Sequence, residues 1–184
     1  RYACVMGGVL GPVVEPSRVD TFDSIGGLQS VASSSRGYSP RGIEQYEAAA
    51  FQIAEQAMTP AEAQDAWMPC DPTGTVDDAC ARRELVRVTR RAWRRPADTA
   101  EVETLVRVAA HAAETVGDFH GGLAYALSAV LQSPRLLFRT EFGASDAVVD
   151  GADVRPLDGW ELGERLAFFL WNTGPDEALL DAAA

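Results

Sequence analysis

The residues best suited to chemistry are four arginines at spacings of four, three and four, namely Arg83, Arg87, Arg90 and Arg94. In a helix these spacings put all four on one face. Guanidinium groups bind phosphate, sulfate or carboxylate through paired hydrogen bonds, so this arginine row is a candidate anion-binding site. The alternative is ion pairing within the chain, which carries 27 acidic residues and a net charge of −11. Both interpretations stay open, and we favour pairing.

The cysteines indicate the cellular compartment of the protein. Cys70 and Cys80 flank a turn-rich segment and lack the second CxxC or the paired histidines of a zinc site. We therefore expect a disulfide between them, which points to export into an oxidising space. Closing so short a loop should stabilise the fold by roughly 2.5–3 kcal/mol. Cys4 is predicted to be a small buried hydrophobe, or else to pair with a cysteine outside this chain.

Other candidate ligands and catalytic groups are weak. His111 and His120 lie on different predicted helices and are too few for a metal site. The acids Asp71, Asp77 and Asp78 fit helix capping and solvation better than a calcium loop. The sequence has no GxSxG, P-loop, GxGxxG or CxxCH motif. We predict no catalytic residue, no metal and no cofactor within the chain, although a His or Met could serve a haem carried elsewhere.

The composition of the chain limits the classes of partner that it is expected to bind. The net charge of −11 argues against binding of nucleic acid or anionic membranes, because phosphate-rich surfaces need an excess of basic groups. All sixteen basic residues are arginine, which we attribute to the codon bias of a GC-rich genome. The longest apolar runs fall short of the ~20 residues that span a bilayer, so no membrane span is predicted. A start at Arg1 suggests a fragment or a processed product.

The best-specified element is the stretch 118–141, around which we expect the other helices to pack. Five apolar residues recur there at i, i+3, i+4, i+7 and i+8 and form one stripe: Leu123, Ala126, Leu127, Val130 and Leu131. Asp118 is expected to cap this helix. Ser133 precedes Pro134 and is interpreted as a helix stop rather than a nucleophile.

Cap signals define the remaining helices. A helix should begin at Ser39-Pro40 and run to about Met58, and capping boxes are predicted at 59–62, 98–101 and 158–161. The arginine row lies on a helix expected over 79–93. The last full helix has an apolar stripe that should need partners beyond this chain, formed by Leu162, Leu166, Phe169 and Leu170.

No strand pattern competes with these helices, so the predicted fold is an all-α, irregular bundle of about seven helices. One long loop, residues 13–38, should be ordered and follow the surface. We expect three parts: an N-terminal helical unit with this loop (1–69), a central helical unit with the disulfide loop (70–145), and the start of a further helical domain (156–184).

Several segments carry a family resemblance. The sequences AWRRP, GDFHGGLAYALSAVLQSPRLLFRTE and PLDGWELGERLAFFLWNTGPDEALL follow the cysteine loop. Together they resemble planctomycete-type (PSD), cytochrome-c-associated exported proteins built from consecutive domains of unknown function, found also in myxobacteria. The resemblance implies export and a haem c domain elsewhere in the full-length protein. It supplies no catalytic residues for this sequence, and the final helices resemble only the beginning of the family's next domain.

The sequence therefore favours a structural and interaction role in an exported, redox-associated multidomain protein, with neighbouring domains of the same protein as partners. The alternative is that the chain forms part of the substrate pocket of an extracellular oxidoreductase or polymer-degrading enzyme whose haem sits in another domain. In that case the arginine row and the 13–38 loop would line a cleft for an anionic or polysaccharide ligand.

Overall fold

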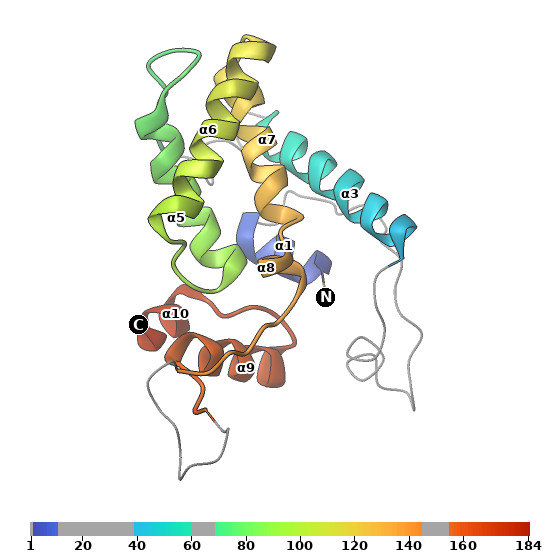
Figure 1. Cartoon of the computed structure of the whole chain (residues 1–184), viewed down its shortest axis with the longest axis vertical. Helices are drawn as coiled ribbons and strands as arrows, with labels where there is room; N and C mark the ends of the chain where they lie inside the picture. The colour runs from blue at the N-terminus through green and yellow to red at the C-terminus, as the bar shows by residue number, and fades with distance from the viewer. Residues whose placement is uncertain (1, 11–38, 60–68, 145–154) are drawn as a thin grey trace.

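The structure, a computed structural model, describes residues 2–10, 39–59, 69–144 and 155–184. Within these ranges the chain forms eight helices and no strand, which confirms the all-α prediction. The expected number was about seven, and one of the eight is a single turn after Ser133. In chain order the helices are α1 Tyr2–Leu10, α3 Pro40–Met58, α5 Asp78–Trp93, α6 Thr99–Val116, α7 Phe119–Leu131, α8 Pro134–Leu137, α9 Gly159–Trp171 and α10 Glu177–Ala183 (Figure 1).

Helices α6 and α7 form the centre of the bundle, with α3 packed on α7 and α5 on α6 (Figure 1). Their close approach depends on Gly122. A Cβ built at this position would lie 2.4 Å from the Cβ of Ala113 and 2.5 Å from the carbonyl oxygen of Ala109. Only a residue without a side chain lets the two helices pack at this distance.

The apolar stripe of α7 is the core of the bundle, as predicted. All five of its residues are at most 1% exposed. Asp118 caps α7 by accepting a hydrogen bond from the Gly121 N–H at 2.6 Å, and the helix ends at Leu131. Ser133 then caps α8, so it is a helix boundary residue. Of the apolar residues after Pro134, Leu136 is buried whereas Phe138 is 45% exposed.

Local cap predictions are confirmed where the structure describes them. Capping boxes pair Asp98 with Glu101 at the start of α6, and Asp158 with Glu161 at the start of α9. Ser39 caps α3. Thr59 closes α3, and its hydroxyl donates to the carbonyl of Glu55. The helix expected after Thr59, the 13–38 loop and the side chain of Cys4 lie outside the described residues.

Helices α9 and α10 pack on each other and lie at the lower end of the molecule in Figure 1. Small residues make this contact: a Cβ on Gly159 would lie 2.2 Å from the Ala183 carbonyl oxygen, and one on Gly163 would lie 3.3 Å from the Ala183 Cβ. The Glu161 carboxylate also accepts hydrogen bonds from the Phe142 and Gly143 N–H groups, at 2.6 and 3.1 Å. None of the helices in the described ranges has the length and hydropathy needed to cross a membrane.

Candidate functional site

The arginine row lies on α5, whose start is fixed by two connections. The predicted disulfide is present: Cys70 and Cys80 are bonded, with Cα atoms 5.8 Å apart, and both residues are buried. Asp77 caps the helix by accepting from the Cys80 N–H at 2.9 Å, and it also accepts from the backbone and hydroxyl of Thr73. These hydrogen bonds, that of Cys80 first, lower the pKa of the Asp77 carboxyl. The three acids of this loop thus include one helix cap.

The N-terminal half of the row is held by a carboxylate from its own helix. Glu84 is buried, and its Oε2 accepts from Arg87 Nη2 at 2.8 Å. Its Oε1 lies 3.7 Å from Arg83 Nε and accepts no hydrogen bond. The Arg83 side chain is 64% exposed, whereas that of Arg87 is 38% exposed. Arg83 is therefore the member of the row most open to solvent.

The C-terminal half of the row contacts the unit formed by α9 and α10. Arg90 forms ion pairs with Glu177 and with Asp181, the latter at 2.7 Å. Its guanidinium carbon also lies 5.7 Å from the centre of the Trp160 ring, within cation–π range. The neighbouring Arg91 pairs with Glu177 too. One end of α5 is thus attached to α9 through an aromatic ring and to α10 through two carboxylates.

Arg94 is the most deeply buried member of the row, at 3% exposure. It is the C-cap residue of α5 and has left-handed backbone geometry, with φ 60°. Its two terminal nitrogens donate four hydrogen bonds to backbone carbonyls of Ala92, Arg135, Leu136 and Phe138, at 2.8–3.3 Å. Its Nε lies 2.9 Å from Glu164 Oε1, an ion pair without the alignment of a hydrogen bond. Arg94 therefore connects α5, α8 and α9.

Glu164, the carboxylate that pairs with Arg94, is largely buried. The side chain of Glu164 is 13% exposed. Burial raises the pKa of Glu164, and the attraction of Arg94 and Arg139 offsets part of that rise. Arg139 and Arg94 both lie over the Phe168 ring, at 5.1 and 5.9 Å from its centre. Sequence reasoning missed Glu164 because nothing in its local pattern distinguishes it from the other acids.

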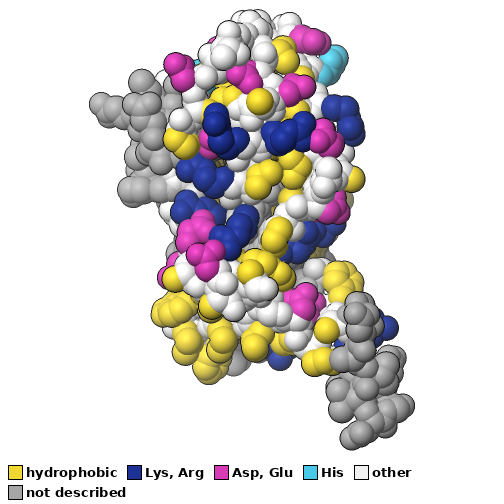
Figure 2. Space-filling model, turned by 90° about the vertical axis from the view of Figure 1, so that its left-hand side faces the viewer, with side chains coloured by type: hydrophobic (Ala, Val, Ile, Leu, Met, Phe, Trp, Pro, Cys, Tyr) yellow, Lys and Arg dark blue, Asp and Glu magenta, His cyan; other side chains and the backbone are white. Residues whose placement is uncertain are grey.

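Arginines beside the row are paired as well. Arg82 pairs with Glu103 of α6, and Arg95 and Arg135 both pair with Glu101. Figure 2 shows the result on the face that turns toward the viewer, where basic and acidic side chains lie next to each other. This pattern is that of ion pairing within the molecule. The anion-binding alternative for the row stays a prediction.

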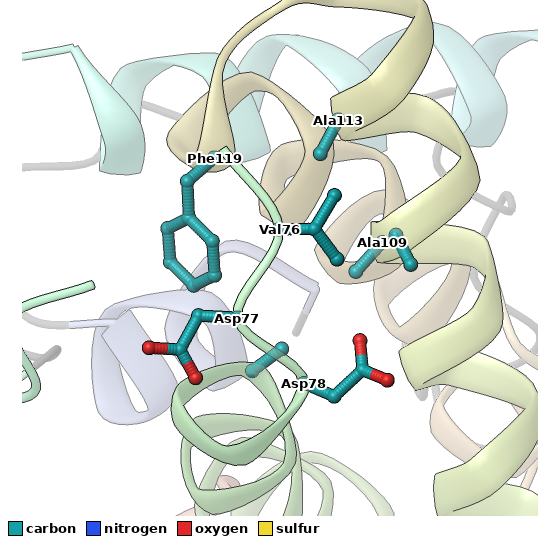
Figure 3. Close-up of a pocket in the computed structure, with 8 residues that line it drawn as sticks. Val76, Asp77, Asp78, Ala109, Ala113 and Phe119 are labelled. Carbon is teal, nitrogen blue, oxygen red and sulfur yellow. The ribbon is translucent and has the colours of Figure 1, made fainter. Parts of the chain in front are cut away.

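A small cavity lies at the start of α5, between this helix and the α6–α7 pair (Figure 3). It is lined by Val76, Asp77, Asp78 and Phe119, among others. Its volume is about 10 Å³, room for about one water molecule. A substrate would need several hundred Å³.

A second concavity is larger and open. It has a volume of about 460 Å³ and is lined by Glu141, Phe142, Gly143, Arg155, Leu157 and Arg165. Arg165 and Glu141 are paired across it by two hydrogen bonds. None of the predicted site residues lies in its lining.

The remaining candidate ligands are scattered. Within the described ranges, no group of three His, Cys, Asp or Glu residues is arranged to hold a metal ion. His120 packs edge-on against Phe119, and His111 is exposed on α6. Met6 and Met58 are buried in the core cluster.

Comparison with known protein families gives two consecutive matches. Residues 80–141 match the family PSD5, described as a protein of unknown function (DUF1595). Residues 157–184 match PSD4, also described as a protein of unknown function (DUF1592). No curated protein and no solved structure matches the chain. The first match covers nearly all of α5 and continues through α8, and the second covers α9 and α10. The ion pairs of Arg90 and Arg94 therefore join the two matched segments.

Proposed function

We propose that this chain is a non-catalytic structural and interaction portion of an exported, redox-associated multidomain protein. In this proposal the arginine row forms a docking seam between consecutive domains, which consists of the contacts of Arg90 and Arg94 with α9 and α10. The observation that carries this proposal is the position of the partners of the row. Arg90 and Arg94 reach Glu177, Asp181 and Glu164, all of them in the second family match. A free anion site would instead present unpaired guanidinium groups.

The ion pairs of the docking seam fix the relative position of the helices more than they contribute to the free energy of folding. Exposed ion pairs each contribute only ~0.2–1 kcal/mol, so Arg90 and Arg91 mainly fix where α10 sits. Arg94 differs because it is buried and donates to several groups at once. Removing one partner of such a pair leaves an uncompensated buried charge, which costs far more than the pair itself contributes. Docking of α9 should therefore depend on Arg94, with the surface pairs setting its orientation.

The wider context is also part of this proposal. The Cys70–Cys80 disulfide supports an exported location, because such bonds persist in oxidising compartments. The domain division 1–69, 70–145 and 156–184 agrees with a seam between the last two parts. The link to cytochrome c, the planctomycete or myxobacterial origin and a haem c in another domain are supported by the sequence resemblance alone.

The enzymatic alternative is favoured by the open concavity beside α9. Its polar lining and its size would suit part of a site for a polysaccharide or anionic ligand. None of its lining residues belongs to the arginine row, and it contains an ion pair that a ligand would have to displace. An absorption spectrum of the full-length protein, recorded with and without oligosaccharides or reductants, tests this alternative. A haem band that responds to a substrate would support the enzyme.

Charge exchange at the seam tests the leading proposal. Glu177→Arg places a third positive charge beside Arg90 and Arg91, and should increase hydrogen exchange in α9 and α10 while leaving α6 and α7 protected. Adding Arg90→Glu to this variant should restore part of the protection. Arg83→Glu is the matched control, because Arg83 is exposed and its ion-pair partner is Glu84 of its own helix. The polyanion dextran sulfate tests the anion-binding alternative. The proposal is wrong if wild type binds dextran sulfate and the double variant Arg87→Glu/Arg90→Glu loses that binding while its stability is unchanged.

A further inference from the structure

Helices α9 and α10 have a buried interior of their own. Ala167 and Leu180 are at most 1% exposed, yet neither belongs to the hydrophobic core cluster of the bundle. Among the described residues after Leu136, Phe168 is the one hydrophobic residue that packs against that cluster, and it is only partly buried. Helices α9 and α10 pack closely on each other, and no other described helix packs closely on either (Figure 1). The pair is therefore a small unit attached to the bundle, the α9–α10 unit.

The chain passes from the bundle into the α9–α10 unit through one short segment. On the bundle side, the carbonyl of Phe138 accepts a hydrogen bond from Arg94 Nη2 at 3.0 Å. On the side of the unit, Glu141 accepts from Arg165 Nε of α9 at 3.1 Å. Residues 139–140 lie between these two anchors in a non-helical stretch, and no hydrogen bond within the described ranges involves their backbone. These two residues are therefore the point about which the unit can turn.

Three ion pairs join α10 to α5: Arg90 pairs with Glu177 and with Asp181, and Arg91 pairs with Glu177. The carboxylates are open to solvent, since the side chain of Glu177 is 42% exposed and that of Asp181 is 73% exposed. Salt screens such charges, because the Debye length falls from about 30 Å at 0.01 M to about 3 Å at 1 M ionic strength. This part of the attachment should therefore weaken as the salt concentration rises.

The buried pair of Arg94 and Glu164 can separate without leaving either charge unsatisfied. The four hydrogen bonds of Arg94 go to carbonyls on the bundle side, so Arg94 keeps them when α9 moves away. In the docked state Arg94 Nε and Glu164 Oε1 are buried and make no hydrogen bond. Both atoms gain water as a partner when the unit separates, which offsets part of the lost attraction. Separation therefore costs less than deleting either partner, and the pairs of Arg90 and Arg91 are the part of the seam that salt can weaken.

We propose that the α9–α10 unit undocks from the bundle as ionic strength rises, turning about residues 139–140. This inference rests on the docking seam proposed above and adds its regulation: the two matched segments are held together at low salt and separate at high salt. The core formed by α6 and α7 should stay closed, because screening acts on charges and not on apolar burial. The opening is therefore a local one, confined to α9 and α10.

Hydrogen exchange of the whole chain at about 0.01 M and about 1 M NaCl tests this inference. Exchange in α9 and α10 should rise about tenfold at the higher salt, the combined effect of three exposed ion pairs, while α6 and α7 keep their protection. The double variant Glu177→Gln/Asp181→Asn should show the raised exchange already at low salt and little further response. Glu103→Gln is the matched control, because Glu103 pairs with Arg82 and its side chain is 39% exposed, close to the 42% of Glu177. It should keep the wild-type response in α9 and α10.

The inference is overturned if α9 and α10 of wild type exchange equally at the two salt concentrations. It is also overturned if the double variant keeps the full salt response of wild type, since the screened charges would then lie elsewhere. Failure of the docking seam itself looks different, because Glu177→Arg would then leave α9 and α10 protected at either salt concentration. A seam that exists but does not respond to salt would show the effect of Glu177→Arg without an effect of NaCl.

Discussion

Replacing Arg94 by alanine should be the most damaging single change in the arginine row. The substitution removes four hydrogen bonds to backbone carbonyls and leaves Glu164 buried without its 2.9 Å partner. Breaking a buried pair on one side costs about 3–5 kcal/mol. Since a domain has a total stability of 5–15 kcal/mol, this loss is a large fraction of it. For a chain of this size it corresponds to a fall in Tm of roughly 6–20 °C.

Urea unfolding followed by tryptophan fluorescence measures this loss. Arg94→Lys should be intermediate, because an ammonium keeps the charge and loses the planar fork that reaches several carbonyls. Arg83→Ala is the control on the same helix and should change the free energy of unfolding by less than ~0.5 kcal/mol. The reasoning fails if Arg94→Ala lies within 1 kcal/mol of wild type, or if Arg83→Ala is equally destabilising.

Three further outcomes are expected. Gly122→Ala should destabilise the fold by roughly 1–3 kcal/mol in urea unfolding, because the added methyl meets the Ala109 carbonyl, whereas Gly8→Ala, which meets nothing within 4 Å, should not. Thiol titration of the unfolded protein should find two more thiols after reduction, and the reduced protein should be less stable by roughly 2.5–3 kcal/mol; an unchanged thiol count would contradict the disulfide. Burial raises the folded-state pKa of Glu164, so the contribution of Glu164 to the free energy of unfolding should be present below its unfolded pKa and lost as pH rises through its folded pKa. Glu164→Gln should therefore flatten that part of the curve of unfolding free energy against pH. An identical curve for wild type and Glu164→Gln would exclude this contribution.

The disulfide and the caps were predictable because each depends on residues close in the chain. Asp118, Asp98 and Asp158 reach N–H groups three residues ahead, and this geometry follows once a helix starts at that point. Cys70 and Cys80 are ten residues apart, near enough for spacing alone to suggest a bond. The buried stripe of α7 was predictable because its apolar residues recur with the period of a helix.

The arginine row was identifiable, but its partners were not. Helical spacing put the four arginines on one face, whereas the Asp181 that Arg90 meets lies 91 residues further along the chain. One acid among 27 cannot be matched to one arginine by pattern alone. The signal available was indirect: Arg94 stands in the AWRRP segment that carries the family resemblance.

The amino-acid sequence by itself determined the helices, their ends, the disulfide and the amphipathic stripes, since all of these arise from contacts within a few turns of one chain segment. The tertiary structure alone decided which stripes became core and which stayed at the surface. The stripes of α7 and α9 look alike in sequence, yet Leu127 is 0% exposed and Phe169 is 84% exposed. The physical reason is that Gly159 and Gly163 let α10 approach one side of α9 and Glu164 ties it to Arg94, so the face left over points outward.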